Sequence, residues 1–266
     1  MDIHDKTSLV YIDKEGSIGK LVLNRAAKRN ALKEAMWRAI PEAVKALDAD
    51  PHVRVILVVS ASDTVFAAGA DIEELQVAAT NPDRQESNRL AIREAQRSLA
   101  RAEKPTIACI QGACVGGGCG IAIHCDFRFA SDTARLGITP AKLGIVYPLN
   151  DTKQLIDLVG SSKAKSLLFT GRILDAEEAL SIGLIDQLIP STCYNAAVLE
   201  FASELARVSQ YSIRHMKKNV QRVLDGQVDD CAETAAIFRE CQLQEDAVEG
   251  IKAFLEKRPA DFKWNG

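Results

Sequence analysis

The feature that most constrains the fold is a change of hydrophobic pattern near residue 151. Before that point, short runs rich in Val and Ile, as strands are, alternate with stretches whose apolar residues recur at helical spacing. After it the spacing is helical almost throughout, apart from residues 184–189. Strands that alternate with helices favour an α/β body. We therefore predict an α/β core over residues 1–193, followed by a C-terminal helical region over residues 194–266.

The pattern also predicts the individual elements. Strands are expected at 9–12, 18–23, 53–60, 64–67, 106–111 and 184–189. Helices are expected at 33–47, 71–79, 83–102, from 116 onward, and then at 161–169, 176–181, 194–208, 213–224 and 228–255. Asp175 and Gly183 are predicted to cap the 176–181 helix at its two ends.

Charge and hydropathy argue against several classes of function. The 33 basic residues nearly balance 36 acidic ones, which leaves a formal net charge of -3. Such a chain has no overall basic field to attract nucleic acid or an anionic membrane. No apolar run reaches the roughly 20 residues that a membrane-spanning helix needs, and the first eight residues are polar and charged rather than signal-like. We expect a cytoplasmic protein without a nucleic-acid or membrane partner.

The cysteines raise the question of a metal site. The chain has seven, an odd number, and no Cys-x-x-Cys pair, which favours reduced thiols. Cys109, Cys114, Cys119, His124 and Cys125 lie close together in the sequence, but their spacing matches no zinc pattern. We therefore expect no metal and interpret these side chains as small residues of the core.

Two glycine-bearing junctions, 66–72 and 111–120, stand where an extended segment becomes a helix. The first N–H groups of a helix have no partner within it and carry the positive end of its dipole, so they suit a carbonyl that becomes an oxyanion. A dinucleotide loop is the rival interpretation of the second junction, but G-x-G-x-x-G fails in every register and no Gly-Lys-Ser/Thr follows. Close packing of helices through small residues is the other alternative.

Taken together, these junctions and their surroundings resemble the crotonase (enoyl-CoA hydratase/isomerase) superfamily. The segments that carry the resemblance, in order and spacing, are 23–32, 66–72, 112–126, 134–144 and 253–258. The resemblance implies a crotonase-like spiral of ββα turns with a C-terminal helical trimerisation region, and acyl-CoA thioesters as substrates. It also implies a homotrimer or hexamer that has no permanently bound cofactor, since CoA enters as part of the substrate.

The resemblance assigns roles to individual residues. The two N–H groups that hold the thioester carbonyl carry over to Ala70 and Gly117. Lys257 would come from a neighbouring subunit, and for the basic residues a solvated surface position is an equal alternative. The residues implied beside the bound CoA thioester are Arg25, Lys28, Ala68, Ala70, Asp71, Ile72, Glu73, Gly117 and Lys257.

The sequence departs from the family at its acid–base positions. Family hydratases carry two glutamates, and the corresponding residues here are Gly120 and Pro140. Hydration of an enoyl thioester needs one group that activates water and one that protonates the α-carbon, and neither residue can serve. Ordinary hydratase activity is therefore not expected.

Tyr147 is the third candidate catalytic residue. With residues 139–144 it resembles the bacterial methylmalonyl-CoA decarboxylases, although those enzymes have a histidine where this chain has Ala70 and a glutamate where it has Gly120. The alternative for Tyr147 is a packing aromatic whose hydroxyl bonds a backbone carbonyl. With a usual pKa of about 10, it would be a better acid than base near neutrality.

Three further polar residues are interpreted as mainly structural. His124 is expected to be a buried histidine with its hydrogen bonds satisfied. Asp126 and Asp151 are expected to be structural, with Asp151 in reserve as a base.

We predict an acyl-CoA enzyme of fatty acid metabolism, a lyase or isomerase that works through an enolate held by Ala70 and Gly117, and decarboxylation is one form of this. An enoyl-CoA isomerase or a catalytically silent acyl-CoA binding protein are the alternatives. Thioester hydrolysis would need an activated water or a nucleophile, and the nearest thiol, Cys119, is expected to face the core.

Overall fold

The computed structural model describes residues 2–264, and within them the strands form two sheets. The larger sheet has the order β1-β2-β3-β5-β7-β10, antiparallel between β1 and β2 and parallel elsewhere. Its strands are β1 (Val10–Glu15), β2 (Ile18–Leu23), β3 (Val55–Ser60), β5 (Thr106–Ile110), β7 (Phe127–Ser131) and β10 (Gln187–Ile189). The smaller sheet has the order β4-β6-β8-β9, and only β9 runs antiparallel to its neighbour. Its strands are β4 (Val65–Ala67), β6 (Ala113–Val115), β8 (Arg135–Gly137) and β9 (Ile173–Asp175).

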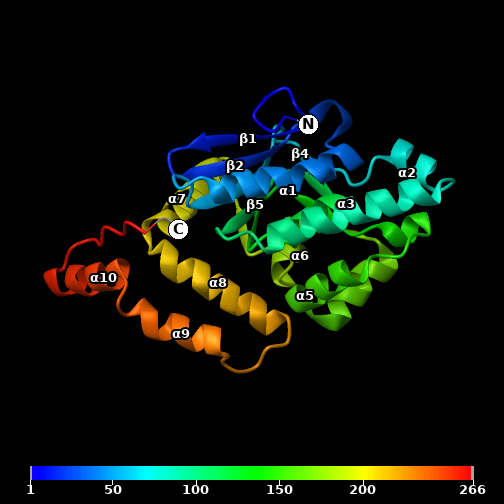
Figure 1. The fold of residues 1–266 in the computed structure, drawn as a ribbon. Coiled ribbons are helices and arrows are strands. Elements are labelled where there is room, and N and C mark those ends of the chain that lie inside the picture. The colour runs from blue at the N-terminus through cyan, green and yellow to red at the C-terminus, as the bar shows by residue number, and fades with distance from the viewer. Residues whose placement is uncertain (1, 265–266) are drawn as a thin grey trace.

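Helices surround the sheets in the first two thirds of the chain (Figure 1). After β10 the described chain contains helices and no further strand. The first group is α1 (Glu34–Ala49), α2 (Ile72–Ala78), α3 (Pro82–Ala100), α4 (Gly117–Ala122), α5 (Leu149–Thr170) and α6 (Ala176–Ser181), with short 3-10 helices η1 (Ala26–Lys28) and η2 (Pro140–Leu143). The second is α7 (Tyr194–Arg207), α8 (Gln210–Leu224), α9 (Ala232–Cys241) and α10 (Glu245–Glu256). In Figure 1, α8, α9 and α10 extend away from the sheets at one side of the molecule.

Strand β3 explains how the larger sheet is covered on both faces. Successive side chains of a strand point to opposite faces, so alternate residues meet different layers. Ile56 and Val58 belong to the core cluster that contains the buried face of α1, whereas Val55 and Leu57 pack in the cluster that contains α7. Both sets are buried, which is why the run reads as continuously apolar.

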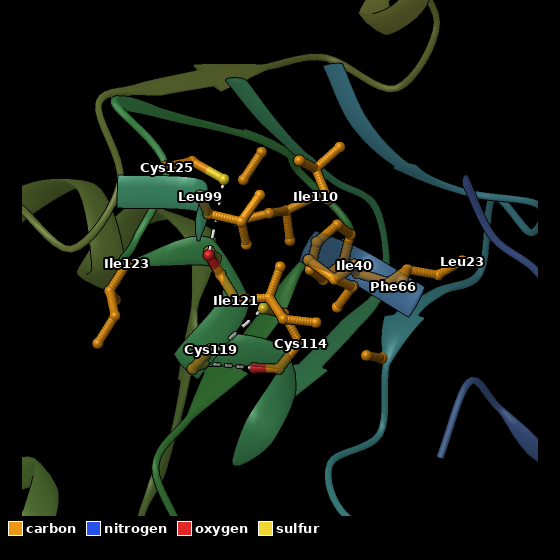
Figure 2. Packing of buried hydrophobic residues seen from close by; sticks show 14 of the residues in the cluster. Leu23, Ile40, Phe66, Leu99, Ile110, Cys114, Cys119, Ile121, Ile123 and Cys125 are labelled. Carbon is orange, nitrogen blue, oxygen red and sulfur yellow. Dashed lines mark hydrogen bonds between the residues drawn. The ribbon is translucent and has the colours of Figure 1, made fainter. Parts of the chain in front are cut away.

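The main core also fixes the elements that lead into the two glycine junctions. Figure 2 shows Phe66 of β4 packed among Leu23 and Ile40, with Cys114 and Cys119 nearby in the same cluster. Cys119 is buried in the core, as predicted, and its thiol donates to the carbonyl of Cys114 at 2.8 Å. All seven cysteines are free thiols.

The α/β class is confirmed, with corrections to single elements. Four strands were not predicted: β6, β7, β8 and β9. The predicted helix 228–255 is two helices, α9 and α10, separated by a turn that contains Leu243. Asp175 caps α6 as expected, since its side chain accepts from the Glu178 N–H. None of the described helices is long and apolar enough to cross a membrane.

Candidate active site

The two glycine junctions lie side by side. Gly69 of the first comes after β4 and Gly116 of the second comes after β6, and these strands are parallel neighbours with Val65 opposite Ala113. Strand ends that run the same way meet at one edge of a sheet, so both junctions come to that edge. Gly69 and Gly116 face each other there, because a Cβ built on Gly69 would lie 3.9 Å from the Gly116 Cα.

Glycine is needed at these contacts. Gly69 has φ 102° and Gly116 has φ 52°, both in the region that side chains disfavour. Gly118 has no such constraint, but a Cβ there would lie 2.6 Å from the Ala67 carbonyl oxygen. The glycines therefore let α4 begin directly against β4.

Among the N–H groups of the described residues, those of Ala70 and Gly117 are without an acceptor, one at each junction. The peptides that flank Ala70 pair with the chain at Leu32, since Leu32 N–H donates to Gly69 at 2.8 Å and Asp71 N–H donates to Leu32 at 3.0 Å. The Ala70 N–H lies between them, and no acceptor for it occurs within residues 2–264. Gly117 is the first residue of α4, and its N–H likewise has no acceptor in the described chain. Both residues are partly exposed, so a ligand can reach them.

A buried ion pair holds the first junction in place. Arg25 donates from Nη1 to the Ala31 carbonyl at 2.7 Å and to Asp71 Oδ2 at 2.6 Å. Asp71 in turn caps α2, accepting from the Glu74 N–H at 3.2 Å. Burial alone would raise the pKa of Asp71, but the hydrogen bonds from Arg25 and Glu74 outweigh it and lower the pKa. Arg25 thus has a structural partner beside its predicted place near CoA.

The other residues predicted beside CoA surround this junction, with one exception. Ala68, just after β4, is partly exposed, and Ile72 and Glu73 are exposed at the start of α2. Lys28 Nζ lies 3.9 Å from the Glu73 carboxylate. Lys257 ends α10, on the far side of the molecule from α2 in Figure 1. Within one chain, Lys257 therefore does not lie near the other residues predicted beside CoA.

The surroundings of Gly120 are polar, although the residue itself carries no side chain. A Cβ built there would meet Gln96 Nε2 at 2.8 Å, Asp151 Oδ2 at 3.9 Å and the Tyr147 hydroxyl at 4.0 Å. Pro140, the other position where family hydratases have glutamate, opens η2 and is partly exposed. A carboxyl group is thus present beside position 120, but it comes from α5.

Asp151 is buried and held by two amide donors. Its residue exposure is 2%. Gln96 donates to Oδ2 at 3.0 Å and Asn150 donates to Oδ1 at 2.8 Å. Burial raises the pKa of Asp151 to about 6, against a smaller lowering by the Gln96 hydrogen bond.

Two titratable groups flank this carboxyl. The Tyr147 hydroxyl is buried with no hydrogen-bond partner among the described residues, and burial, followed by the nearby Asp151, raises its pKa. His124 donates from Nδ1 to the Gly120 carbonyl at 2.7 Å when that nitrogen carries the proton, which leaves Nε2 3.7 Å from Asp151 Oδ1. Burial lowers the pKa of His124 to about 4, so the ring is neutral at physiological pH.

Gln96 is the member of this cluster that sequence reasoning missed. It lies on α3 with an exposure of 1%, on the buried face formed by Ala91, Ala95 and Leu99. A polar residue on an apolar helical stripe is the signal that could have found it, because buried polar groups need partners. Asp126, predicted as structural, accepts from Thr106 and Lys217 away from this cluster.

Comparisons with known proteins show the family to which the chain belongs. The sequence model of the family described as enoyl-CoA hydratase/isomerase matches residues 13–265. The crotonyl-CoA hydratase of Syntrophomonas wolfei is 33% identical over 256 residues, which cover 95% of this chain and 97% of that protein. The short-chain-enoyl-CoA hydratase of Clostridium acetobutylicum is 33% identical over 251 residues, covering 94% and 95%. A crystal structure of an enoyl-CoA hydratase/isomerase family protein from Hyphomonas neptunium superposes with a TM-score of 0.94 at 40% identity, covering 97% of this chain and 98% of that one.

Proposed function

The chain belongs to the enoyl-CoA hydratase/isomerase family and is an enzyme of that family, and from this premise we propose that it decarboxylates a malonyl-type acyl-CoA thioester through an enolate. The enolate oxygen is held by the backbone N–H groups of Ala70 and Gly117. The observation that carries the proposal is that Gly69 and Gly116 face each other, so that the unpartnered N–H groups of the next residues, Ala70 and Gly117, begin from adjacent points of the chain. Positions 120 and 140, where family hydratases have glutamates, hold glycine and proline.

The unpartnered donors support an oxyanion hole. Donors that are already fixed in place stabilise charge as it develops on an oxygen, without reorganisation at the moment of reaction. Gly117 begins α4, so the positive end of that helix adds to the same effect. The hydrogen bonds on both sides of Ala70 and the Arg25–Asp71 pair hold the first donor rigidly.

The missing glutamates favour decarboxylation over hydration. Hydration needs one group to activate water and another to protonate the α-carbon. The cluster beside Gly120 offers one carboxyl group, that of Asp151. Decarboxylation needs no base to begin, because the bond to the leaving CO2 supplies the electron pair that becomes the enolate. Glutamates at positions 120 and 140 would also repel the carboxylate of a malonyl-type substrate, and without them this like-charge repulsion is absent.

The Tyr147 hydroxyl supports the proposal as a candidate donor. It has no partner within the described residues, so its O–H is available to donate to a bound acyl group. Its raised pKa keeps the hydroxyl protonated. We assign it the positioning of the acyl group, or of a proton, near the α-carbon.

A panel of CoA thioesters tests the proposal by mass spectrometry. The panel contains crotonyl-CoA, butyryl-CoA, malonyl-CoA and methylmalonyl-CoA. We expect loss of CO2 from a carboxylated thioester and negligible hydration of crotonyl-CoA. Fast hydration, or no CO2 from any malonyl-type thioester, would overturn it. Binding of all four without turnover would indicate a catalytically silent acyl-CoA protein.

A further inference from the structure

The proposed function leaves the source of the last proton open. An enolate made by loss of CO2 must take up one proton at its α-carbon, and Tyr147, whose pKa is raised, is a weak acid for that step. The buried acid beside it is Asp151 of α5, which the oxyanion chemistry does not use.

Geometry connects Asp151 to the site through Gly120. The glycine begins the second turn of α4, three residues after the Gly117 donor. Its missing side chain leaves a position whose nearest neighbours are Gln96, Asp151 and Tyr147. Family hydratases carry a glutamate at this position, and here a carboxyl oxygen from another helix lies 3.9 Å from the place of the Cβ.

Gln96 fixes that carboxyl group. Its amide nitrogen donates to Asp151 Oδ2 at 3.0 Å, and its amide oxygen accepts from Asn150 at 3.3 Å. Asn150 also donates to Asp151 Oδ1 at 2.8 Å. Both carboxyl oxygens are thus oriented by neutral donors, and no cation among the described residues pairs with the acid.

Resting on the proposed enolate function, we propose that Asp151 is the proton-transferring carboxyl group of this site and that Gln96 is the residue that positions it. After CO2 leaves, the Asp151 carboxyl O–H bond breaks, its proton joins the α-carbon, and the enolate electron pair forms the new C–H bond. Asp151 is left as a carboxylate and regains a proton from water. In reverse, the carboxylate removes an α-proton from a saturated thioester, and the C–H electron pair becomes the enolate.

Two other titratable groups face Asp151, and neither replaces it. His124 has a pKa lowered to about 4, and its ring donates to the Gly120 carbonyl rather than toward the site. Tyr147 has a raised pKa. Asp151, with a pKa raised to about 6, exchanges protons in the range between them.

The reverse step gives a direct test. Butyryl-CoA is incubated with the enzyme in D2O, and deuterium at its α-carbon is measured by mass spectrometry and NMR. We expect exchange with the wild type and at least a hundredfold slower exchange with Asp151→Asn, the lower range for loss of general acid–base catalysis. Binding of butyryl-CoA, measured by calorimetry, should be unchanged.

Asp157→Asn is the matched control, because Asp157 lies on the same helix but pairs with Lys153 at the surface. It should exchange at the wild-type rate. If Asp151→Asn also does so, Asp151 is not the acid–base group, while the oxyanion proposal stands. If the wild type shows no exchange, Asp151 is again rejected, and loss of CO2 from the thioester panel judges the proposed function separately.

The pH dependence of the exchange rate tests whether Gln96 positions Asp151 or only packs against it. The exchange rate per bound thioester should rise with pH through about 6, as Asp151 becomes the carboxylate that acts as base. The Gln96 hydrogen bond lowers the pKa of Asp151, so Gln96→Leu should move this limb to higher pH. Circular dichroism checks that the variant is folded. A limb that does not move in folded Gln96→Leu, or that persists in Asp151→Asn, would overturn the assignment.

Discussion

At the scale of single residues, the N–H of Gly117 is the group whose removal tests the oxyanion proposal most directly. Gly117→Pro deletes this donor at the first position of α4, and it also strains the turn, because a proline disfavours the backbone angles of the preceding Gly116 (φ 52°, ψ −113°). Loss of one such donor should lower kcat about 10²- to 10³-fold. The measurement is turnover of the best thioester of the panel, with thermal melting to confirm the fold.

Gly117→Ala provides the comparison, since it keeps the N–H but adds a methyl group 3.0 Å from Trp37 Cζ2 and 3.1 Å from Leu32 Cδ1. Those side chains must shift slightly, so we expect a smaller loss of kcat than in Gly117→Pro. Equal losses in both variants would mean that shape, not the donor, matters at this position.

Asp151 should lower the free energy of unfolding when its carboxyl group is ionised. Its pKa is raised from 3.8 to about 6 in the folded state, so the folded protein holds the proton more tightly than the unfolded one. The stability from this proton is complete below pH 4 and is lost as the pH rises through about 6. Above that range the buried charge costs roughly 2–3 kcal/mol.

Asp151→Asn should therefore raise the melting temperature at pH 8 and change it much less at pH 4, even as it slows exchange. Calorimetry at both pH values measures this. Such a pattern marks a residue retained for activity rather than stability. An Asn variant that melts lower at pH 8 would identify the carboxylate as a structural anchor instead.

At the scale of elements, two glycines of α4 should respond differently to the same substitution. In Gly118→Ala, the new Cβ would lie 2.6 Å from the Ala67 carbonyl oxygen, and the backbone of β4 cannot move freely. We expect a loss of about 1–3 kcal/mol in the free energy of unfolding, as in other overpacked cores. In Gly120→Ala, the nearest atom is the end of the Gln96 side chain, which can rotate away.

Gly120→Ala should lose less stability than Gly118→Ala, and its loss is the buried hydrogen bond from Gln96 to Asp151, worth about 1 kcal/mol. Urea unfolding of the two variants measures the difference. By displacing Gln96 from Asp151, Gly120→Ala should also shift the pH limb of exchange upward. A Gly118→Ala protein as stable as the wild type would show that α4 is not fixed against β4.

The same elements show how far sequence reasoning reaches. Long periodic segments such as α1 and β3 were predictable, because their buried faces impose a clear spacing. Strands β6, β8 and β9 are three residues each, too short to show a period. The helix 228–255 was predicted as one because apolar residues continue through the turn, and Leu243 is exposed there.

The part of the candidate site that is built from backbone N–H groups was predictable. The glycines at the two strand–helix junctions can be recognised in the sequence, and so can the lack of carboxylates at positions 120 and 140. The partners of Gly120 were not predictable, because Gln96 and Asp151 come from α3 and α5 and meet only through tertiary packing. When a carboxyl group beside one helix comes from a different helix, as Asp151 of α5 does beside Gly120 of α4, no local sequence pattern reveals it.

At the scale of the whole molecule, the C-terminal helices expose an apolar surface that a single chain does not cover. On α8, Met216, Val220 and Val223 are all exposed and follow helical spacing, so they lie on one face. Phe254 and Leu255 of α10 are exposed as well. Exposed apolar side chains gathered on a helix face mark interaction sites.

We propose that this surface joins copies of the chain into a homotrimer or hexamer, consistent with the resemblance to the crotonase superfamily. Analytical ultracentrifugation at micromolar concentration should give three or six times the 28.9 kDa chain mass. Val220→Glu places a charge in the middle of the α8 stripe, where burying it without a partner is costly, so it should shift the protein toward smaller species. Val228→Glu is the matched control, because Val228 is 97% exposed in the loop between α8 and α9, outside the stripe, whereas Val220 is 61% exposed within it. A monomeric wild type would contradict the assembly, and a Val220→Glu protein that sediments like the wild type would place the interface elsewhere.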